Sequence, residues 1–214
     1  MILNLKRLIA SNKYFWKYRH LINKKFFSFS YGKIPKDHFN KVFNNLNIKS
    51  VLDFGCATGD KLQYFTKNGS DIIYGIDINS RALSTAKNKF QDTGVYYKFS
   101  KKIILDDINI FLNKRNIDKF DLIIVERLFY ILNNKEFFNS VNILSKKTKY
   151  LYIDDFFLKN FFFNDKIRKK INGYTHTYFD EVFDSNFKKI YDENSPYSEV
   201  KFANTRCVLY KFIY

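Results

Sequence analysis

The chain has few of the residues that crosslink small proteins or interrupt regular structure. Its 214 residues include two cysteines, two prolines and seven glycines. With Cys56 and Cys207 as the only cysteines, a disulfide framework is excluded, and a reducing cytoplasm is the expected compartment. No apolar run approaches the ~20 residues that span a bilayer, and no signal peptide is expected at the N-terminus. Hydrophobic residues make up 46% of the chain, which excludes a disordered protein and indicates one domain with a full core.

Acidic residues are almost absent from the first 45 positions. That segment holds ten Lys or Arg residues and one acid, Asp37, so it carries +9 of the net charge of +16. We therefore divide the chain into a basic helical segment, 1–45, and a main domain, 46–214. A helix is expected over 1–27 and is interpreted as docking on the main domain, with covering a substrate or lying on an acidic surface as alternatives. His20 and His38 in this segment are interpreted as structural.

Strand-like and helical patterns alternate from residue 51 onward. Strands are expected at 51–54, 72–78, 102–105, 121–125 and 150–153, and helices at 60–67, 79–90, 108–114 and 134–145. The last two strand patterns, 187–191 and 201–213, have no helix between them and should form an antiparallel hairpin at the sheet edge. The expected fold is α/β, a Rossmann-like doubly wound seven-stranded sheet that is mostly parallel, with this C-terminal hairpin and an N-terminal helical segment.

A glycine-containing loop joins the first strand to the first helix of the main domain. Asp53 closes the strand, Gly55 and Gly59 lie in the loop, and Lys61 opens the helical pattern. Such a loop lets a ligand approach backbone N–H groups at a helix N-terminus. Asp77 ends the second strand 24 positions after Asp53, where an acid is placed to hold a ribose diol. The two features predict a nucleoside-containing cofactor.

These motifs resemble those of the class I S-adenosylmethionine-dependent methyltransferases, over roughly residues 45–214. The segment from Asp53 to Gly59 is similar to the family's first motif, D-x-G-x-G-x-G, with Ala57 in place of the middle glycine. Segment 75–78 is similar to the family's second motif, segment 105–108 to its third motif, and segment 120–127 to its fourth strand. Nicotinamide and flavin enzymes favour G-x-G-x-x-G instead, which this loop does not match. The resemblance implies S-adenosylmethionine as cofactor and S-adenosylhomocysteine as product.

The resemblance also implies the cofactor contacts. The N–H groups of the loop would pack against the cofactor, Asp53 would orient the loop or accept from the cofactor's amino group, and Asp77 would hold the ribose. Ile78 and Ile108 would sandwich the adenine, and Asp107, or its close competitor Asp106, would accept from the adenine amino group. The expected cofactor-binding residues are Asp53, Gly55, Cys56, Ala57, Thr58, Gly59, Asp77, Ile78, Asp106, Asp107, Ile108 and Glu126. Tyr31 and Lys33 lie in a region that often closes over the cofactor in this family.

Methyl transfer is an in-line displacement, so the protein contributes mainly positioning, but an acceptor hydroxyl or amine can also need a general base. The candidates near strand C-termini are Glu126, Tyr130, Asp154 and His176. Each candidate also has an alternative interpretation. Glu126 could instead be a backbone contact beside the cofactor, and Asp154 and Asp155 could be helix caps or solvated acids. His176 could be an exposed loop residue. Adjacent acids point to opposite faces of a strand, so no metal site is expected. Cys56 is interpreted as a small filler beside the cofactor.

The leading hypothesis is a methyltransferase that acts on an oxygen or nitrogen of a small molecule or sugar. Aromatic residues after the fourth and fifth strands suit a ring-bearing or glycosyl acceptor. One alternative is an RNA or protein methyltransferase that uses the basic segment to bind phosphate. Glu126-Arg127-Leu128-Phe129 argues against base N-methylation, because enzymes for exocyclic amines often carry an Asn/Asp-Pro-Pro-aromatic run there. A further alternative is a partner subunit without activity.

Overall fold

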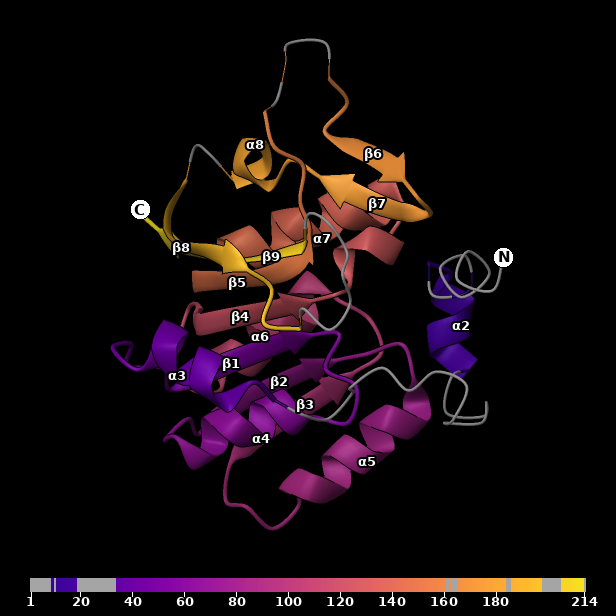
Figure 1. The fold of residues 1–214 in the computed structure, drawn as a ribbon. Coiled ribbons are helices and arrows are strands. Elements are labelled where there is room, and N and C mark those ends of the chain that lie inside the picture. The colour runs from indigo at the N-terminus through magenta and orange to yellow at the C-terminus, as the bar shows by residue number, and fades with distance from the viewer. Residues whose placement is uncertain are drawn as a thin grey trace.

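A seven-stranded sheet forms the centre of the molecule. The computed structural model describes residues 9, 11–18, 34–160, 162, 165–183, 186–197 and 205–213. The strand order is β3-β2-β1-β4-β5-β9-β8 (Figure 1). The strands of this sheet are β1 (Ser50–Phe54), β2 (Ile72–Ile76), β3 (Tyr96–Ser100), β4 (Phe120–Glu126), β5 (Thr148–Phe156), β8 (Phe187–Asn194) and β9 (Thr205–Phe212). Strands β1 to β5 are parallel, and β9 is antiparallel to both β5 and β8, so the predicted fold is confirmed.

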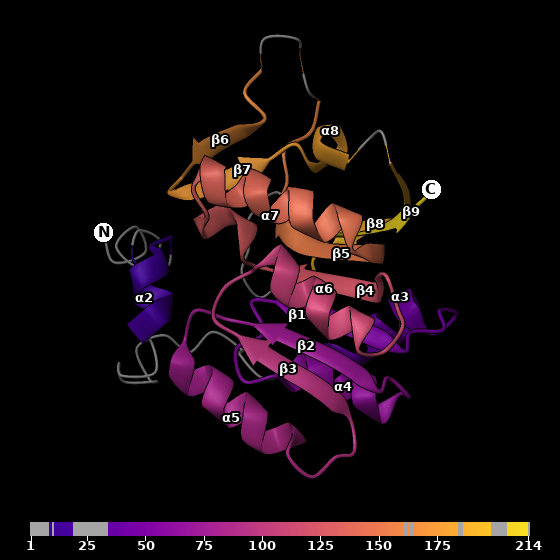
Figure 2. The same cartoon turned by 180° about the vertical axis from the view of Figure 1, so that it is seen from behind.

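Helices cover both faces of the sheet, which gives three layers (Figure 2). One face packs against α3 (Lys36–Phe43), α4 (Asp60–Lys67) and α5 (Ser80–Phe90), through side chains such as Phe39, Leu62 and Phe90. The other face packs against α6 (Leu105–Asn113), α7 (Asn134–Lys146) and α8 (Phe179–Phe183), through side chains such as Ile108, Phe137 and Phe179. Because both faces are covered, β1 and β2 are buried at every residue and read as near-continuous apolar runs.

The parallel strands bring the predicted motifs to one edge of the sheet. Asp53 pairs with Gly75 of β2 on one side and with Ile124 of β4 on the other, so the segments that follow these three strands leave the sheet side by side. Glu126 in turn pairs with Asp154 of β5. The carboxyl ends of the central strands are where ligands bind in open parallel sheets.

Two helices of the basic segment contact the main domain. Helix α3 contributes the fully buried Phe39 to the core. Helix α2 (Lys13–Tyr18) lies beyond the carboxyl ends of the parallel strands (Figure 1). Its Lys13 Nζ lies 2.6 Å from Glu136 Oε1 at the start of α7, and Asn79 Nδ2 donates to the carbonyls of Trp16 and Lys17. The described part of the predicted 1–27 helix therefore docks on the sheet domain, whereas His20, Tyr31 and Lys33 lie outside the described residues.

The third strand was mispredicted. The sequence placed it at 102–105, but β3 is Tyr96–Ser100, and Leu105 already begins α6. The apolar run Ile103–Leu105 suggested a strand, yet Asp106 and Asp107 occupy the first turn of the helix, where the helix dipole favours acids.

The region after β4 contains elements that the sequence did not predict. Strand β5 continues through Asp154 and Asp155 to Phe156 rather than ending before them. A second, two-stranded sheet of β6 (Arg168–Ile171) and β7 (Tyr174–Thr177) follows, and the short 3₁₀ helix η2 (Phe129–Ile131) precedes α7. His176 therefore lies in a strand and not in an exposed loop. Among the described residues, no helix is long and apolar enough to cross a membrane.

Candidate active site

The loop after β1 is held in place by its own amide groups. The N–H groups of Gly55 and Cys56 donate to the carbonyl of Ile76 at 2.8 and 3.0 Å, and Gly59 N–H donates to the Cys56 carbonyl. Gly55, Ala57 and Gly59 have φ values of 97°, 45° and 77°, the left-handed region that favours glycine. The N–H groups of Gly55 and Cys56, which were expected to face a ligand, therefore bond the loop to β2 instead. At Gly55 and Gly59 the absence of a side chain leaves room for Leu128 and for Ala86 and Phe90 of α5.

Asp77 joins this loop to the start of α5. Its Oδ2 accepts from Ala57 N–H at 2.9 Å, and its Oδ1 accepts from Asn79 N–H at 2.8 Å. Asn79 in turn caps α5 by accepting from the N–H groups of Arg81 and Ala82. Each carboxylate oxygen keeps further acceptor capacity, so Asp77 can hold a diol while it fixes the loop.

Lys61 forms a buried ion pair with two acids from neighbouring strands. Its Nζ lies 3.5 Å from Asp53 Oδ2 and 3.2 Å from Glu126 Oε2. Although burial lowers the pKa of Lys61, the two carboxylates raise it above its ordinary value. Burial raises the pKa of Asp53 to about 7, against the effect of Lys61, and both of its oxygens are buried. Asp53 therefore orients Lys61, a contact that sequence reasoning missed.

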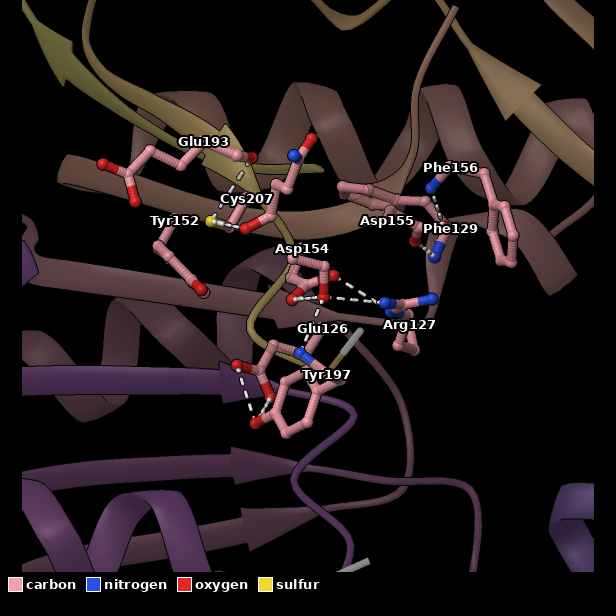
Figure 3. A network of polar contacts seen from close by, with 12 residues as sticks. Glu126, Arg127, Phe129, Tyr152, Asp154, Asp155, Phe156, Glu193, Tyr197 and Cys207 are labelled. Atoms are coloured by element: carbon pink, nitrogen blue, oxygen red, sulfur yellow. Dashed lines mark hydrogen bonds and ion pairs between the residues drawn. The ribbon is translucent and has the colours of Figure 1, made fainter. Parts of the chain in front are cut away.

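Glu126 also contacts the segment that follows β8. The Tyr197 hydroxyl donates to the Glu126 carboxylate at 3.2 Å to Oε2 (Figure 3). Burial, together with the charge of Glu126, raises the pKa of Tyr197, so its hydroxyl stays protonated. Glu126 thus lies between Lys61 on the side of β1 and Tyr197 on the side of β8, and only 6% of its side chain is exposed.

Asp154 is closed off rather than available as a base. It is fully buried and accepts from Arg127 Nε at 2.9 Å (Figure 3) and from Ser195 Oγ at 2.7 Å. Arg127 has a φ of 51°, a left-handed conformation that lets it turn back onto β5, and its Nη2 donates to Ser195 Oγ. Burial raises the pKa of Asp154 to about 7, against the effect of Arg127. The structure therefore makes Asp154 an anchor for Arg127 and Ser195, and its predicted role as a catalytic base stays a prediction.

Asp155 points to the other side of β5. Its Oδ2 accepts from the N–H of Phe129, the first residue of η2, at 2.8 Å, and its exposure is 1%. Asp155 therefore caps a short helix, one of the two alternatives expected for it. Since Asp154 and Asp155 hold different segments on opposite faces, they share no metal site. No group of three or more His, Cys, Asp or Glu residues suited to a metal occurs in the described part of the chain.

Aromatic rings pack together beside these acids. Tyr130, Phe156 and Tyr174 form a separate cluster, in which Phe156 and Tyr174 stack with centroids 4.6 Å apart. His176 packs edge-on against Phe156, is 4% exposed, and lies with Nδ1 3.2 Å from the Tyr174 carbonyl, so Nδ1 donates and Nε2 carries the lone pair. Burial lowers the pKa of His176, which keeps it neutral. Tyr130 and His176 line a rigid wall, and their burial does not favour the predicted role as base.

The predicted adenine contacts are only partly in place. Ile78 is 41% exposed after β2, as a ligand-facing residue should be, whereas Ile108 is fully buried in the core. Ile108 is therefore a packing residue, because the helix begins three positions earlier than expected. Asp106 and Asp107 both lie in the first turn of α6, and Asp107 Oδ1 is 3.5 Å from Lys98 Nζ. Cys56 is buried and burial raises its pKa, in keeping with a small filler.

Comparison with known proteins decides between the cofactor classes. A family model described as a methyltransferase domain matches residues 47–204. The chain belongs to this methyltransferase-domain family. An uncharacterized protein of Haemophilus influenzae is 32% identical over 63 residues, which make up 29% of this chain and 25% of that protein. This methyltransferase thus matches about a quarter of that relative's length.

Solved structures share the methyltransferase fold at low sequence identity. The N-methyltransferase NodS from Bradyrhizobium japonicum, in complex with S-adenosylhomocysteine, matches with a TM-score of 0.61 and 15% identity, over 94% of this chain and 97% of NodS. The magnesium protoporphyrin IX methyltransferase from Synechocystis with bound S-adenosylmethionine has a TM-score of 0.55 and 16% identity, over 82% and 76% of the two chains. An rRNA methylase from Escherichia coli has a TM-score of 0.53 and 12% identity, over 83% and 63%. Such likeness shows the fold alone.

The family match shows a methyltransferase domain, and S-adenosylmethionine is the cofactor that its site suits. The residues present suit this cofactor, since Gly55 and Gly59 have the positive φ values of the glycine loop, the Asp77 carboxylate lies directly after β2, and Ile78 is exposed beside it. When bound, S-adenosylmethionine supplies an electrophilic methyl group on a sulfonium. The contributions of Lys61, Arg127, Ser195 and Tyr197 were not foreseen. A lysine in the first turn of a helix, where the dipole disfavours a cation, was the one available signal.

Proposed function

We propose that this methyltransferase transfers a methyl group to an oxygen or nitrogen atom of a small-molecule or sugar acceptor. The observation that carries the proposal is the position of the segment Ser195–Tyr197. Ser195 bonds to Asp154 at the end of β5, and Tyr197 bonds to Glu126 at the end of β4, so this segment crosses the strand ends where an acceptor would lie (Figure 3). A site bordered in this way suits a small acceptor better than a polymer.

The aromatic wall supports an acceptor that contains a ring. Tyr130, Phe156 and Tyr174 form a buried apolar cluster next to the charged residues, and Arg127 lies 5.4 Å from the centroid of Phe156. Sites for small ligands combine such apolar walls with few fixed polar groups. Helix α2 borders the same edge from the other side through its contacts to Asn79 and Glu136.

Each residue of the site has a positioning role in this proposal. Asp77 holds the ribose and the loop, and the backbone of 55–59 excludes water from one side of the cofactor. Glu126 is the acid best placed to receive a proton from the acceptor, because its side chain is 6% exposed whereas those of Asp53 and Asp154 are 0% exposed. Asp154 takes no part in proton transfer here.

The test is the destination of a labelled methyl group. Purified protein is incubated with S-adenosylmethionine carrying a tritiated methyl and with cell extract separated into small-molecule, RNA and protein fractions. We expect label in the small-molecule fraction, with Asp77→Ala as the inactive control. Label confined to RNA or protein would refute the proposed acceptor class, and no label in any fraction would favour a partner subunit without activity.

The RNA alternative has one specific observation in its favour, the +9 charge of residues 1–45. One of these cations, Lys13, is paired with Glu136 in the fold. RNA binding through this segment should weaken steeply with salt, since neutralised phosphates release counterions. If the protein does not bind RNA, or if its affinity for RNA does not change with salt concentration, this alternative is refuted.

A further inference from the structure

We propose that Lys61 is a cofactor-binding residue that recognises the carboxylate of the methionine portion of S-adenosylmethionine. The inference rests on the proposed use of this cofactor and extends it to a residue outside the motifs. It also changes the role of Asp53, which would act through Lys61 as a positioning residue rather than accept from the cofactor's amino group directly.

The first step is the accessibility of the three charged groups. Both carboxylate oxygens of Asp53 are inaccessible to solvent and the residue is 0% exposed, so a ligand cannot reach this acid in the observed conformation. The side chain of Glu126 is 6% exposed and that of Lys61 is 16% exposed. Lys61 is thus the most accessible charge of the cluster, directly beside the loop of the first motif.

The second step is the position of Lys61 on α4. Gly59 is the N-cap of this helix and supplies no side-chain cap, and the acid of the first turn, Asp60, is paired with Lys89 at 2.6 Å, so the first-turn N–H groups keep their tendency to attract an anion. Lys61 adds a full positive charge in the same turn. A helix end and an ammonium group together suit a carboxylate, and the buried Asp53, 3.5 Å from Lys61 Nζ, fixes the ammonium from behind.

The third step is charge balance. Lys61 faces two acids, Asp53 and Glu126, so with both ionised the cluster carries a net charge of −1. An anion alone would add to this charge, whereas the amino-acid end of the cofactor is a zwitterion. Its carboxylate would pair with Lys61 while its ammonium group lies toward the Glu126 side. The amino-acid end then adds no net charge to the cluster, and each of its two charges has a partner, as buried charges need.

The experiment compares three ligands that differ only in this end of the molecule. Binding of S-adenosylhomocysteine, its decarboxylated analogue S-adenosyl-3-thiopropylamine, and 5′-methylthioadenosine is measured by calorimetry. We expect Lys61→Met to weaken S-adenosylhomocysteine about 10- to 100-fold, the loss typical of a charge-assisted contact, and the two ligands without the carboxylate by less than about threefold. Lys61→Arg should retain most of the affinity for S-adenosylhomocysteine.

Two outcomes would overturn the role of Lys61. The first is an equal loss for all three ligands, which would mean that Lys61 only supports the loop, and the second is no loss for any of them. Since Lys61→Met leaves Asp53 buried without a cation, the double variant Asp53→Asn/Lys61→Met is measured in parallel and should show the same selective loss. If the unaltered protein binds none of the three ligands, the proposed use of the cofactor is refuted instead.

Discussion

Substitution of Asp77 by alanine should separate cofactor binding from loop stability. Asp77 accepts from the N–H groups of Ala57 and Asn79 at 2.9 and 2.8 Å. Each hydrogen bond to a charged group contributes ~1.5–3 kcal/mol, so losing both should cost about 3 kcal/mol or more. For a chain of this size, 1 kcal/mol corresponds to ~2–4 °C in melting temperature, and Asp77→Ala should melt about 6–12 °C lower.

The ligand response gives the second readout of this prediction. S-adenosylhomocysteine at 100 times its dissociation constant stabilises a protein that binds it only when folded by ~2.7 kcal/mol, which is about 5–10 °C here. In Asp77→Ala this increment should vanish, because the ribose loses its acceptor. The measurement is thermal unfolding with and without ligand, followed by circular dichroism.

Asp121 provides a matched control at the opposite edge of the sheet. Its Oδ2 accepts from the N–H groups of Lys49 and Ser50 at 2.9 and 3.0 Å, so Asp121→Ala also removes an acid that holds two amides. Asp121→Ala should lose a comparable amount of stability, but S-adenosylhomocysteine should still raise its melting temperature by the full amount. If Asp77→Ala keeps the same increment as Asp121→Ala, the assignment of Asp77 to the ribose is wrong.

Three further changes test the core and the buried charges. A Cβ on Gly75 would lie 2.4 Å from ring atoms of Phe99, so Gly75→Ala should lower the free energy of unfolding by ~1–3 kcal/mol in urea denaturation. Arg168→Met should lower the free energy of unfolding by ~2–4 kcal/mol in the same assay. The buried guanidinium donates to the backbone carbonyls of Phe129 and Leu132, and these carbonyls lose their donor in the variant. The pKa of Asp53 is about 7 in the folded protein against an ordinary 3.8, so the stability gained from its protonated form is full below about pH 4 and lost as pH rises through 7. Between about pH 5 and 8 the melting temperature of the unaltered protein should therefore fall more steeply with rising pH than that of Asp53→Asn. Parallel curves of melting temperature against pH would contradict the raised pKa.

The elements around the cofactor motif could be predicted because local and tertiary preferences agree there. Helix α4 spans Asp60–Lys67, as the pattern indicated, and Asn79 caps α5 as its residue type suggests. The third strand failed because the two signals conflict. Strand β3 lies at the sheet edge and is only partly buried, so its pattern is weak, whereas Ile103–Leu105 is apolar because it packs at the start of a helix.

The polar contacts of the site could not be derived from sequence spacing. Lys61 and Asp53 are eight residues apart, but Glu126 and Tyr197 are brought together across 71 residues by the pairing of β4, β5, β9 and β8. Asp154 looked like a solvated acid because carboxylates are rare inside strands. Its burial is tolerated only because Arg127 and Ser195, from two other segments, complete its hydrogen bonds.

The acids at the carboxyl edge of this sheet share a common physical role. Asp53 holds Lys61, Asp154 holds Arg127 and Ser195, and each lies at the end of a different strand. A buried carboxylate is costly unless it is paired, so each acid fixes its partner more firmly than an exposed acid would. In the proposed function the partners, rather than the acids, would then face the ligands. Lys61, supported from behind by carboxylates, would present a fixed donor, and the Tyr197 hydroxyl, whose proton goes to Glu126, would present a fixed acceptor.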